Sequence, residues 1–297
     1  MSDKKITRYN NEIAIIGMAC RFPGANNYNE FWENLKNGVN SIKEISPERW
    51  DINKYYSPDI NEPNKSISKW CGLVDDFDKF DNGFFNISPR EAAHMYPQQR
   101  LLLEATWHCI EDSGMPLKRL QKKKTSVYVG VMAIDYHQEI AAANAETDSY
   151  TAAGNYESML ANRISFVFGL KGQSMSIDAA CASSLVALHE AGLSLTHSKS
   201  DYAIAAGVSL NFHPFKYISF SKSGMLSPDG KCKTFDKDAN GYVPGDGVGV
   251  LLLQRLEYAV KQNATIYGII KGSAVNHTGN SLSLTSPSVE AQKEVLI

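Results

Sequence analysis

Cys181 is the side chain of this sequence best placed to act as a nucleophile. It follows the strand-like run SMSIDAA at 174–180 and precedes ASSLVALHEAGLSL at 182–195, in which leucines recur with helical spacing. The thiol is therefore expected at the amino terminus of a helix, where unpaired backbone N–H groups favour a thiolate and can bind an oxyanion. An unpaired cysteine can equally be a small buried apolar residue, so position alone leaves both interpretations open.

The cysteines as a set do not suggest a disulfide framework or a metal site. Their number is odd and none has CxxC spacing, so each is expected to be a free thiol. The five are Cys20, Cys71, Cys109, Cys181 and Cys232.

The composition is typical of a globular protein, and we expect neither nucleic acid nor a membrane as a partner. The chain has 297 residues, 43% hydrophobic and 21% charged, which is enough to bury one large core. The net charge is -2, and Lys and Arg are spread along the sequence without a concentrated basic stripe. No apolar run approaches the roughly 20 residues of a membrane-spanning helix, and no signal-peptide pattern precedes the fold. We expect a cytoplasmic protein.

Strand-like and helix-like segments alternate after a polar tail at residues 1–11. The expected buried strands are 13–17, 126–132, 174–180, 202–210, 248–253 and 266–274, and the expected helices are 28–35, 156–168, 182–196, 256–262 and a last one from 288. This alternation predicts an α/β fold. Residues 41–86 have no clean period and many Pro, Asn and Asp residues, which indicates a packed surface excursion.

A further helix is expected to begin at Pro89. Ser88 precedes it as the N-cap, and Glu91 stands three residues after the cap, the arrangement of a capping box. Pro97 should interrupt this helix, after which helical sequence continues to a stop at Gly114.

The segment DAACASSLVAL at 178–188 resembles the active-site segment of ketosynthases from modular polyketide synthases, which is usually DTACSSSLVAL. Further segments resemble the same family in the same order: IAIIGMACRFPGA at 13–25, FWENLKNG at 31–38, FFNISPREAAHMYPQQRLLLEATWHCIEDSG at 84–114, ANRISF at 161–166 and MLSPDGKCKTFDKDANGYVPGDGVGVLLL at 225–253. Together they cover nearly all of residues 12–296. Three positions depart from the pattern, because Ala179 stands where Thr is usual, Ala182 where Ser is usual and Tyr96 where Asp is usual.

The resemblance implies a thiolase-like fold, layered α-β-α-β-α, in which two similar α/β halves form the core. Residues 12–297 would then be a ketosynthase domain that is incomplete at its carboxyl end. Its N-terminal half would be complete over 12–254, and the C-terminal half would only begin at 255–297.

The resemblance also implies a two-step reaction. Cys181 takes an acyl chain from the phosphopantetheine arm of an acyl carrier protein, and a carrier-bound malonyl unit then loses CO2 and attacks the stored thioester. No cofactor is expected to bind the chain directly. The implied partners are the acyl carrier protein, other polyketide synthase domains and a second copy of the ketosynthase in a homodimer.

The histidines that assist condensation in the family, in an HGTGT and a later GH segment, would lie after residue 297. The seven histidines of this sequence stand in neither motif: His94, His108, His137, His189, His197, His213 and His277. His189 lies eight residues after Cys181, about two helical turns away, and is expected to pack or contact solvent. His277 is expected to be structural.

Two other functions stay open at this point. A domain that lacks a downstream histidine would pass acyl chains between carrier proteins without condensing them. A papain-like cysteine hydrolase is the third possibility, although no signature of those enzymes surrounds Cys181.

Smaller features also have two interpretations. Met132 is either a core methionine or part of the wall of an acyl tunnel, near the loop at Asp135 and Tyr136. The segments 234–236 and 245–247 are expected to form tight turns, since a phosphate or metal loop would need a Walker lysine or alternating acidic ligands.

Overall fold

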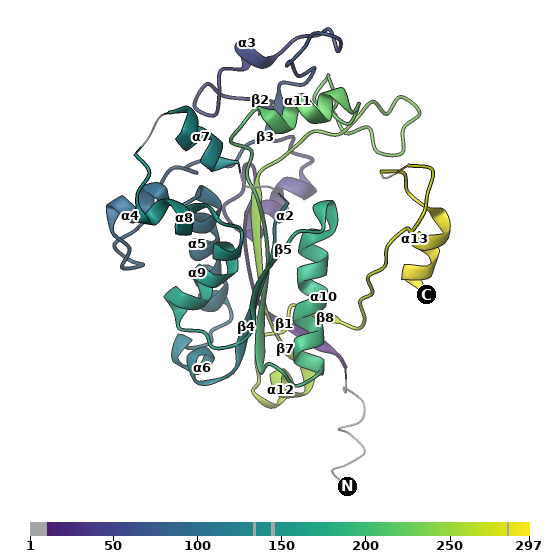
Figure 1. The fold of residues 1–297 in the computed structure, drawn as a ribbon. Helices are drawn as coiled ribbons and strands as arrows, with labels where there is room; N and C mark the ends of the chain where they lie inside the picture. The colour runs from purple at the N-terminus through teal and green to yellow at the C-terminus, as the bar shows by residue number, and fades with distance from the viewer. Residues whose placement is uncertain (1–10, 133–134, 144–145, 284) are drawn as a thin grey trace.

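The chain forms a mixed six-stranded sheet with helices on both faces (Figure 1). The computed structural model describes residues 11–132, 135–143, 146–283 and 285–297. The tail expected at 1–11 therefore lies outside the described residues, apart from Asn11. The strand order in the sheet is β5-β4-β6-β7-β1-β8, and β2 and β3 form a separate two-stranded sheet.

The strands are β1 (Ile13–Arg21), β2 (Ile42–Glu44), β3 (Trp70–Gly72), β4 (Thr125–Gly130), β5 (Ser174–Ile177), β6 (Tyr202–Ser209), β7 (Gly247–Arg255) and β8 (Gly268–Ile270). The helices are α2 (Tyr28–Lys36), α3 (Ile52–Tyr55), α4 (Pro89–His94), α5 (Pro97–Asp112), α6 (Leu117–Lys122), α7 (Tyr136–Ala142), α8 (Ser149–Asn155), α9 (Ser158–Phe168), α10 (Ser183–Thr196), α11 (Phe215–Lys222), α12 (Leu256–Lys261) and α13 (Val289–Leu296). A short 3-10 helix, Ala180–Ala182, precedes α10.

The two faces of the sheet are covered unequally. Helices α5 and α9 pack on one face and build the larger core, while α10 packs on the other face against β4 and β6 (Figure 1). The interior strands β4 and β6 are buried over most of their length; β6 is almost entirely apolar, whereas β4 also buries the polar Thr125 and Ser126. On the α10 side, Leu185 of that helix remains 70% exposed.

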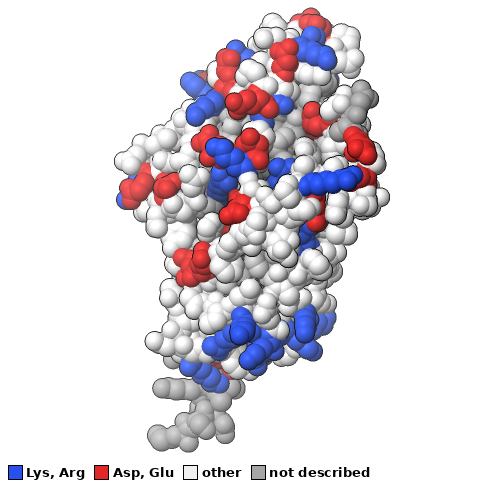
Figure 2. Space-filling model, turned by 90° about the vertical axis from the view of Figure 1, so that its left-hand side faces the viewer, with Lys and Arg blue, Asp and Glu red and all other residues white. Residues whose placement is uncertain are grey.

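The direction of the strands places Cys181 at one end of the sheet. Strands β4, β5 and β6 are parallel, and Cys181 follows the carboxyl end of β5. At the opposite end α6 leads into β4, and basic side chains gather at the lower end of the molecule in Figure 2. Five exposed cations belong to α6 and the residues beside it, namely Lys118, Arg119, Lys122, Lys123 and Lys124. The sequence had not led us to expect so local a concentration of basic charge.

The excursion expected at 41–86 packs against the carboxyl end of the sheet. It contains β2, α3 and β3 and shares a third small core with α11, in which the rings of Trp50 and Tyr217 meet edge to face at 5.2 Å. Trp50 is 7% exposed, so the excursion is anchored by its own apolar side chains.

Most expected elements are confirmed. Ser88 Oγ accepts a hydrogen bond from the Glu91 N–H at 3.1 Å and caps α4, and Pro97 opens α5 after a break. The strand expected over 266–274 is wrong in extent: β8 has three residues, and Ile269 is 45% exposed because among the described strands only β1 pairs with it. The expected last helix is α13, capped by Ser288.

No helix in the described ranges is long and apolar enough to cross a lipid bilayer.

Candidate functional site

Cys181 occupies a tight turn between β5 and α10. Ala180 has φ 51°, a left-handed value that is unusual for a residue with a Cβ and that bends the chain sharply before the cysteine. The Ala180 N–H donates to Asp178 Oδ1 at 2.8 Å, and the Ala182 N–H donates to the Ala179 carbonyl at 3.1 Å. The Cys181 thiol is exposed, and its own N–H has no hydrogen-bond partner among the described residues. The turn therefore presents a thiol together with a free donor.

Ser183 fixes this turn from inside. Its hydroxyl accepts from the Ala179 N–H at 2.9 Å and donates to the Ala180 carbonyl at 2.6 Å. The side chain is buried at the first position of α10, so these two hydrogen bonds replace water on both backbone groups. The sequence showed Ser183 only as a small neighbour of the cysteine.

Two glycines let the start of α10 lie close to the sheet. A Cβ on Gly130, at the end of β4, would stand 2.4 Å from the Ser184 N atom, and a Cβ on Gly207 of β6 would stand 2.7 Å from the Ser184 Cβ. Both distances are below any real Cβ contact, so neither strand can carry a side chain here without moving the helix. The nucleophile is thus held by backbone packing as well as by hydrogen bonds.

A cavity of about 630 Å³ opens beside Cys181. Its wall comes from β1, from the carboxyl ends of β4 and β6, from β7 and from the first turns of α10, and most of the side chains that line it are apolar. Met132 is one of them, which supports the tunnel-wall interpretation over a purely core role. A cavity of this size and character suits an acyl chain.

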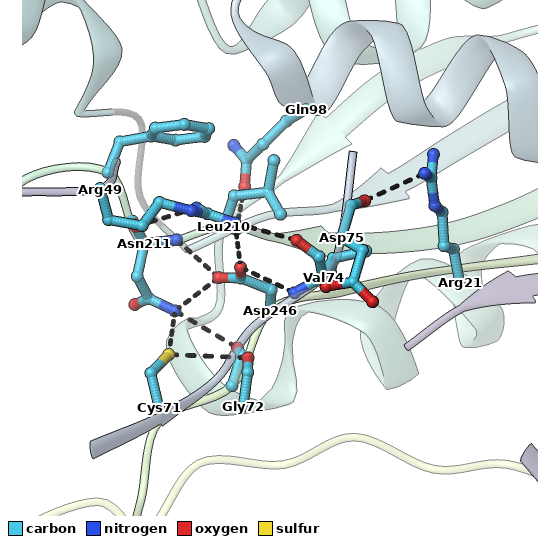
Figure 3. Close-up of polar contacts among 12 residues, drawn as sticks. Arg21, Arg49, Cys71, Gly72, Val74, Asp75, Gln98, Leu210, Asn211 and Asp246 are labelled. Atoms are coloured by element: carbon cyan, nitrogen blue, oxygen red, sulfur yellow. Dashed lines mark hydrogen bonds and ion pairs between the residues drawn. The ribbon is translucent and has the colours of Figure 1, made fainter. Parts of the chain in front are cut away.

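The segment at 245–247 lines the same cavity, and its Asp246 forms a buried ion pair with Arg49 (Figure 3). Arg49 Nη2 meets Asp246 Oδ2 at 2.5 Å, with the two side chains 1% and 0% exposed. Asp246 also accepts from the N–H groups of Asn211 at 2.9 Å and Val74 at 3.3 Å. Burial raises the pKa of Asp246, and Arg49 and these donors oppose that rise. Because every partner is a donor, the site is built for the ionised carboxylate.

Lys216 joins this network through Asn211. Its Nζ donates to Asn211 Oδ1 at 3.0 Å, and Asn211 Nδ2 donates to Asp246 Oδ1 at 3.1 Å. Burial lowers the pKa of Lys216, whereas Asp135 and, more weakly, Cys181 act in the opposite direction. Sequence reasoning missed this set, because its members follow no motif and Arg49 lies 162 residues before Asn211 and 197 before Asp246. The one signal was an Asp between two glycines.

The other residues singled out in the sequence have hydrogen bonds or backbone conformations typical of structural roles. A ring nitrogen of His189 lies 2.8 Å from Ser273 Oγ, and His277 accepts from the Gly279 N–H at 2.9 Å. Phe235 has φ 62° at the tight turn expected over 234–236. No group of three or more metal-ligating side chains occurs in the described part of the chain.

The three departures from the family pattern have different settings. Ala179 and Ala182 belong to the cysteine turn, where the hydroxyls of the usual residues are missing. Tyr96 lies at the start of α5, where it is 1% exposed and its hydroxyl donates to Asp135 Oδ1 at 2.7 Å.

Comparison with known sequences agrees with this geometry. The β-ketoacyl synthase N-terminal domain model matches residues 10–259. The polyketide synthase ThaG of Burkholderia thailandensis is 44% identical over 285 residues, which are 96% of this chain and 5% of that protein. The polyketide synthase PksL of Bacillus subtilis is 43% identical over 283 residues, which are 95% of this chain and 6% of that protein. The chain thus spans only a small fraction of the length of these relatives.

Solved structures show the same fold. The oxazolomycin ketosynthase domain OzmH KS7 of Streptomyces albus has a TM-score of 0.91 and 36% identity, covering 96% of this chain and 49% of that one. The ketosynthase from module 6 of the bacillaene synthase of Bacillus subtilis has a TM-score of 0.87 and 41% identity, covering 96% and 47%. The expected α/β, thiolase-like fold is confirmed, and the chain corresponds to about half of each solved domain.

Proposed function

Because this chain belongs to the β-ketoacyl synthase family, we propose that Cys181 is the acyl-accepting nucleophile of a ketosynthase of polyketide biosynthesis. The observation that carries this proposal is the turn itself, which presents an exposed thiol and an unpartnered N–H at the mouth of an apolar cavity. A buried structural cysteine would have neither feature.

In the loading step, the Cys181 sulfur attacks the carbonyl carbon of an acyl thioester carried on the phosphopantetheine arm of an acyl carrier protein. A C–S bond to Cys181 forms, the bond to the carrier sulfur breaks, and the carrier leaves as a thiol after taking a proton. The free Cys181 N–H can donate to the carbonyl oxygen as it becomes negative, and the first turn of α10 adds its dipole. The cavity beside the turn holds the acyl chain away from water.

In the condensing step, a carrier-bound malonyl unit loses CO2, and the resulting carbanion attacks the stored thioester. A C–C bond forms, the C–S bond to Cys181 breaks, and the thiol is restored. We place this step in the complete domain, which pairs as a homodimer and works beside other polyketide synthase domains. The chain's own contribution is to hold the acyl group on Cys181 and to shape the cavity.

The proposal is tested by supplying an acyl carrier protein thioester and malonyl carrier protein and following both products by mass spectrometry. The chain should gain the acyl mass, and the complete domain should release a β-ketoacyl thioester. Cys181→Ala should abolish both, while Cys232→Ala, which removes the other exposed thiol, should abolish neither. Loading without condensation by the complete domain would favour the acyl-transfer module, and hydrolysis of peptide substrates would favour the hydrolase.

A further inference from the structure

Tyr96 makes contacts that the residue usual at this position cannot make. Its hydroxyl donates to Asp135 Oδ1 at 2.7 Å, and its ring stacks on Tyr136 with centroids 5.8 Å apart and an interplanar angle of 10°. An aspartate in place of Tyr96 would be shorter and would bring a second carboxylate toward Asp135. Like charges at such a site repel each other, so the link depends on tyrosine.

Asp135 is the centre of the link. Its second oxygen accepts from the N–H groups of Phe212 at 3.2 Å and His213 at 3.0 Å. The Phe212 ring also meets the rings of Tyr96 and Tyr136 edge to face, at 5.9 and 6.0 Å. One carboxylate therefore ties together the start of α5, the segment after β4 and the segment after β6.

These segments carry part of the wall of the Cys181 cavity. Val131 and Met132 follow β4 directly and line the cavity, and Ser209 at the end of β6 lines it too. The Tyr96–Asp135 link lies three residues beyond Met132 along the chain, and Phe212 lies three residues beyond Ser209. The sheet pairs Gly130 with Gly207, and Asp135 joins the two segments again beyond that pair through the N–H groups of Phe212 and His213.

We propose that Tyr96 is a positioning residue that, through Asp135, holds the walls after β4 and β6 at a fixed separation and thereby limits the size of acyl group that Cys181 accepts. This inference rests on the proposed function and deepens it. Tyr96 itself does not touch the acyl group. Its hydroxyl acts on the selectivity of loading rather than on the reactivity of the thiol.

The test compares the native chain with Tyr96→Phe, which keeps the buried ring and removes the hydroxyl. Loading rates on Cys181 are measured with acetyl and hexanoyl thioesters, and iodoacetamide reports the intrinsic reactivity of the thiol. Loss of one hydrogen bond should raise the hexanoyl-to-acetyl ratio of kcat/KM by about fivefold, with alkylation unchanged. Tyr202→Phe is the matched control, because its hydroxyl contacts Gln262 and Met115 away from the cavity, and it should leave the ratio unchanged.

Asp135→Asn provides a second perturbation of the same link and should move the ratio in the same direction, since an amide cannot accept from every donor that the carboxylate serves. If the native chain is loaded and both variants keep its hexanoyl-to-acetyl ratio of kcat/KM, the inference about Tyr96 is overturned and the proposed function stands. Absence of loading in the native chain would remove the proposed function and this inference with it.

Discussion

Replacing Gly130 with alanine should move the nucleophile without touching it. The added Cβ would stand 2.4 Å from the Ser184 N atom and 2.5 Å from the Ser183 carbonyl carbon, whereas ordinary contact begins at 3.4 Å. The start of α10 must therefore retreat by about 1 Å, since the obstacle is backbone and cannot rotate away. Overpacking of this kind costs about 1–3 kcal/mol of unfolding free energy. A displacement of about 1 Å in a reacting group lowers the rate by about 100-fold.

The assay follows acyl loading of Cys181 by intact-protein mass spectrometry and unfolding by chemical denaturation. Gly268→Ala is the matched control, because its Cβ would meet only Ile15 Cδ1 at 3.8 Å in the same sheet. We expect the control to load within about twofold of the native rate, since ordinary contacts cost little. Native loading and native stability in Gly130→Ala would refute the claim that backbone packing positions the thiol.

Three further outcomes follow from the buried polar groups. Arg49→Met should lower the unfolding free energy by about 3–5 kcal/mol in denaturant titrations, because it leaves the Asp246 carboxylate buried and unpaired; a loss below about 1 kcal/mol would contradict this. Ser183→Ala should cost about 1–3 kcal/mol and slow loading, because the Ala179 N–H and the Ala180 carbonyl lose their partner, and unchanged loading would show that the turn holds itself. Burial raises the pKa of Glu104 from 4.5, so its protonated form is favoured by folding and that contribution is lost as the pH rises through the folded pKa. The Glu104→Gln variant lacks this titration, so its stability minus that of the native chain should rise between pH 4 and pH 8 in thermal melts. A difference that stays constant with pH would contradict the sign of the pKa shift.

Local signals predicted the elements around the nucleophile well. Strand-like sequence before Cys181 and helical leucine spacing after it predicted β5 and α10 within a few residues, because both elements depend on neighbours along the chain. The short helices α7, α8 and α11 were not predicted. Each has seven or eight residues and is held largely by tertiary contacts that periodicity does not contain.

The polar framework of the site could not be predicted in the same way. Arg49 and Asp246 are 197 residues apart, and Arg49 stands in a stretch that has no periodic pattern. Tyr96 was noticed as a departure from a motif, yet only the fold shows that Asp135 is its partner. Pairings of this kind depend on which loops meet at the carboxyl end of the sheet, and that is settled by topology.

The distribution of an acyl label between the two exposed cysteines tests the central claim most directly. Cys181 and Cys232 are both exposed, but only Cys181 lies at a helix start beside the apolar cavity. After brief treatment with an acyl thioester, peptide mapping should find the label on Cys181 and none on Cys232. Equal labelling of the two thiols would mean that exposure alone governs reactivity, and it would contradict the assignment of Cys181 as the nucleophile.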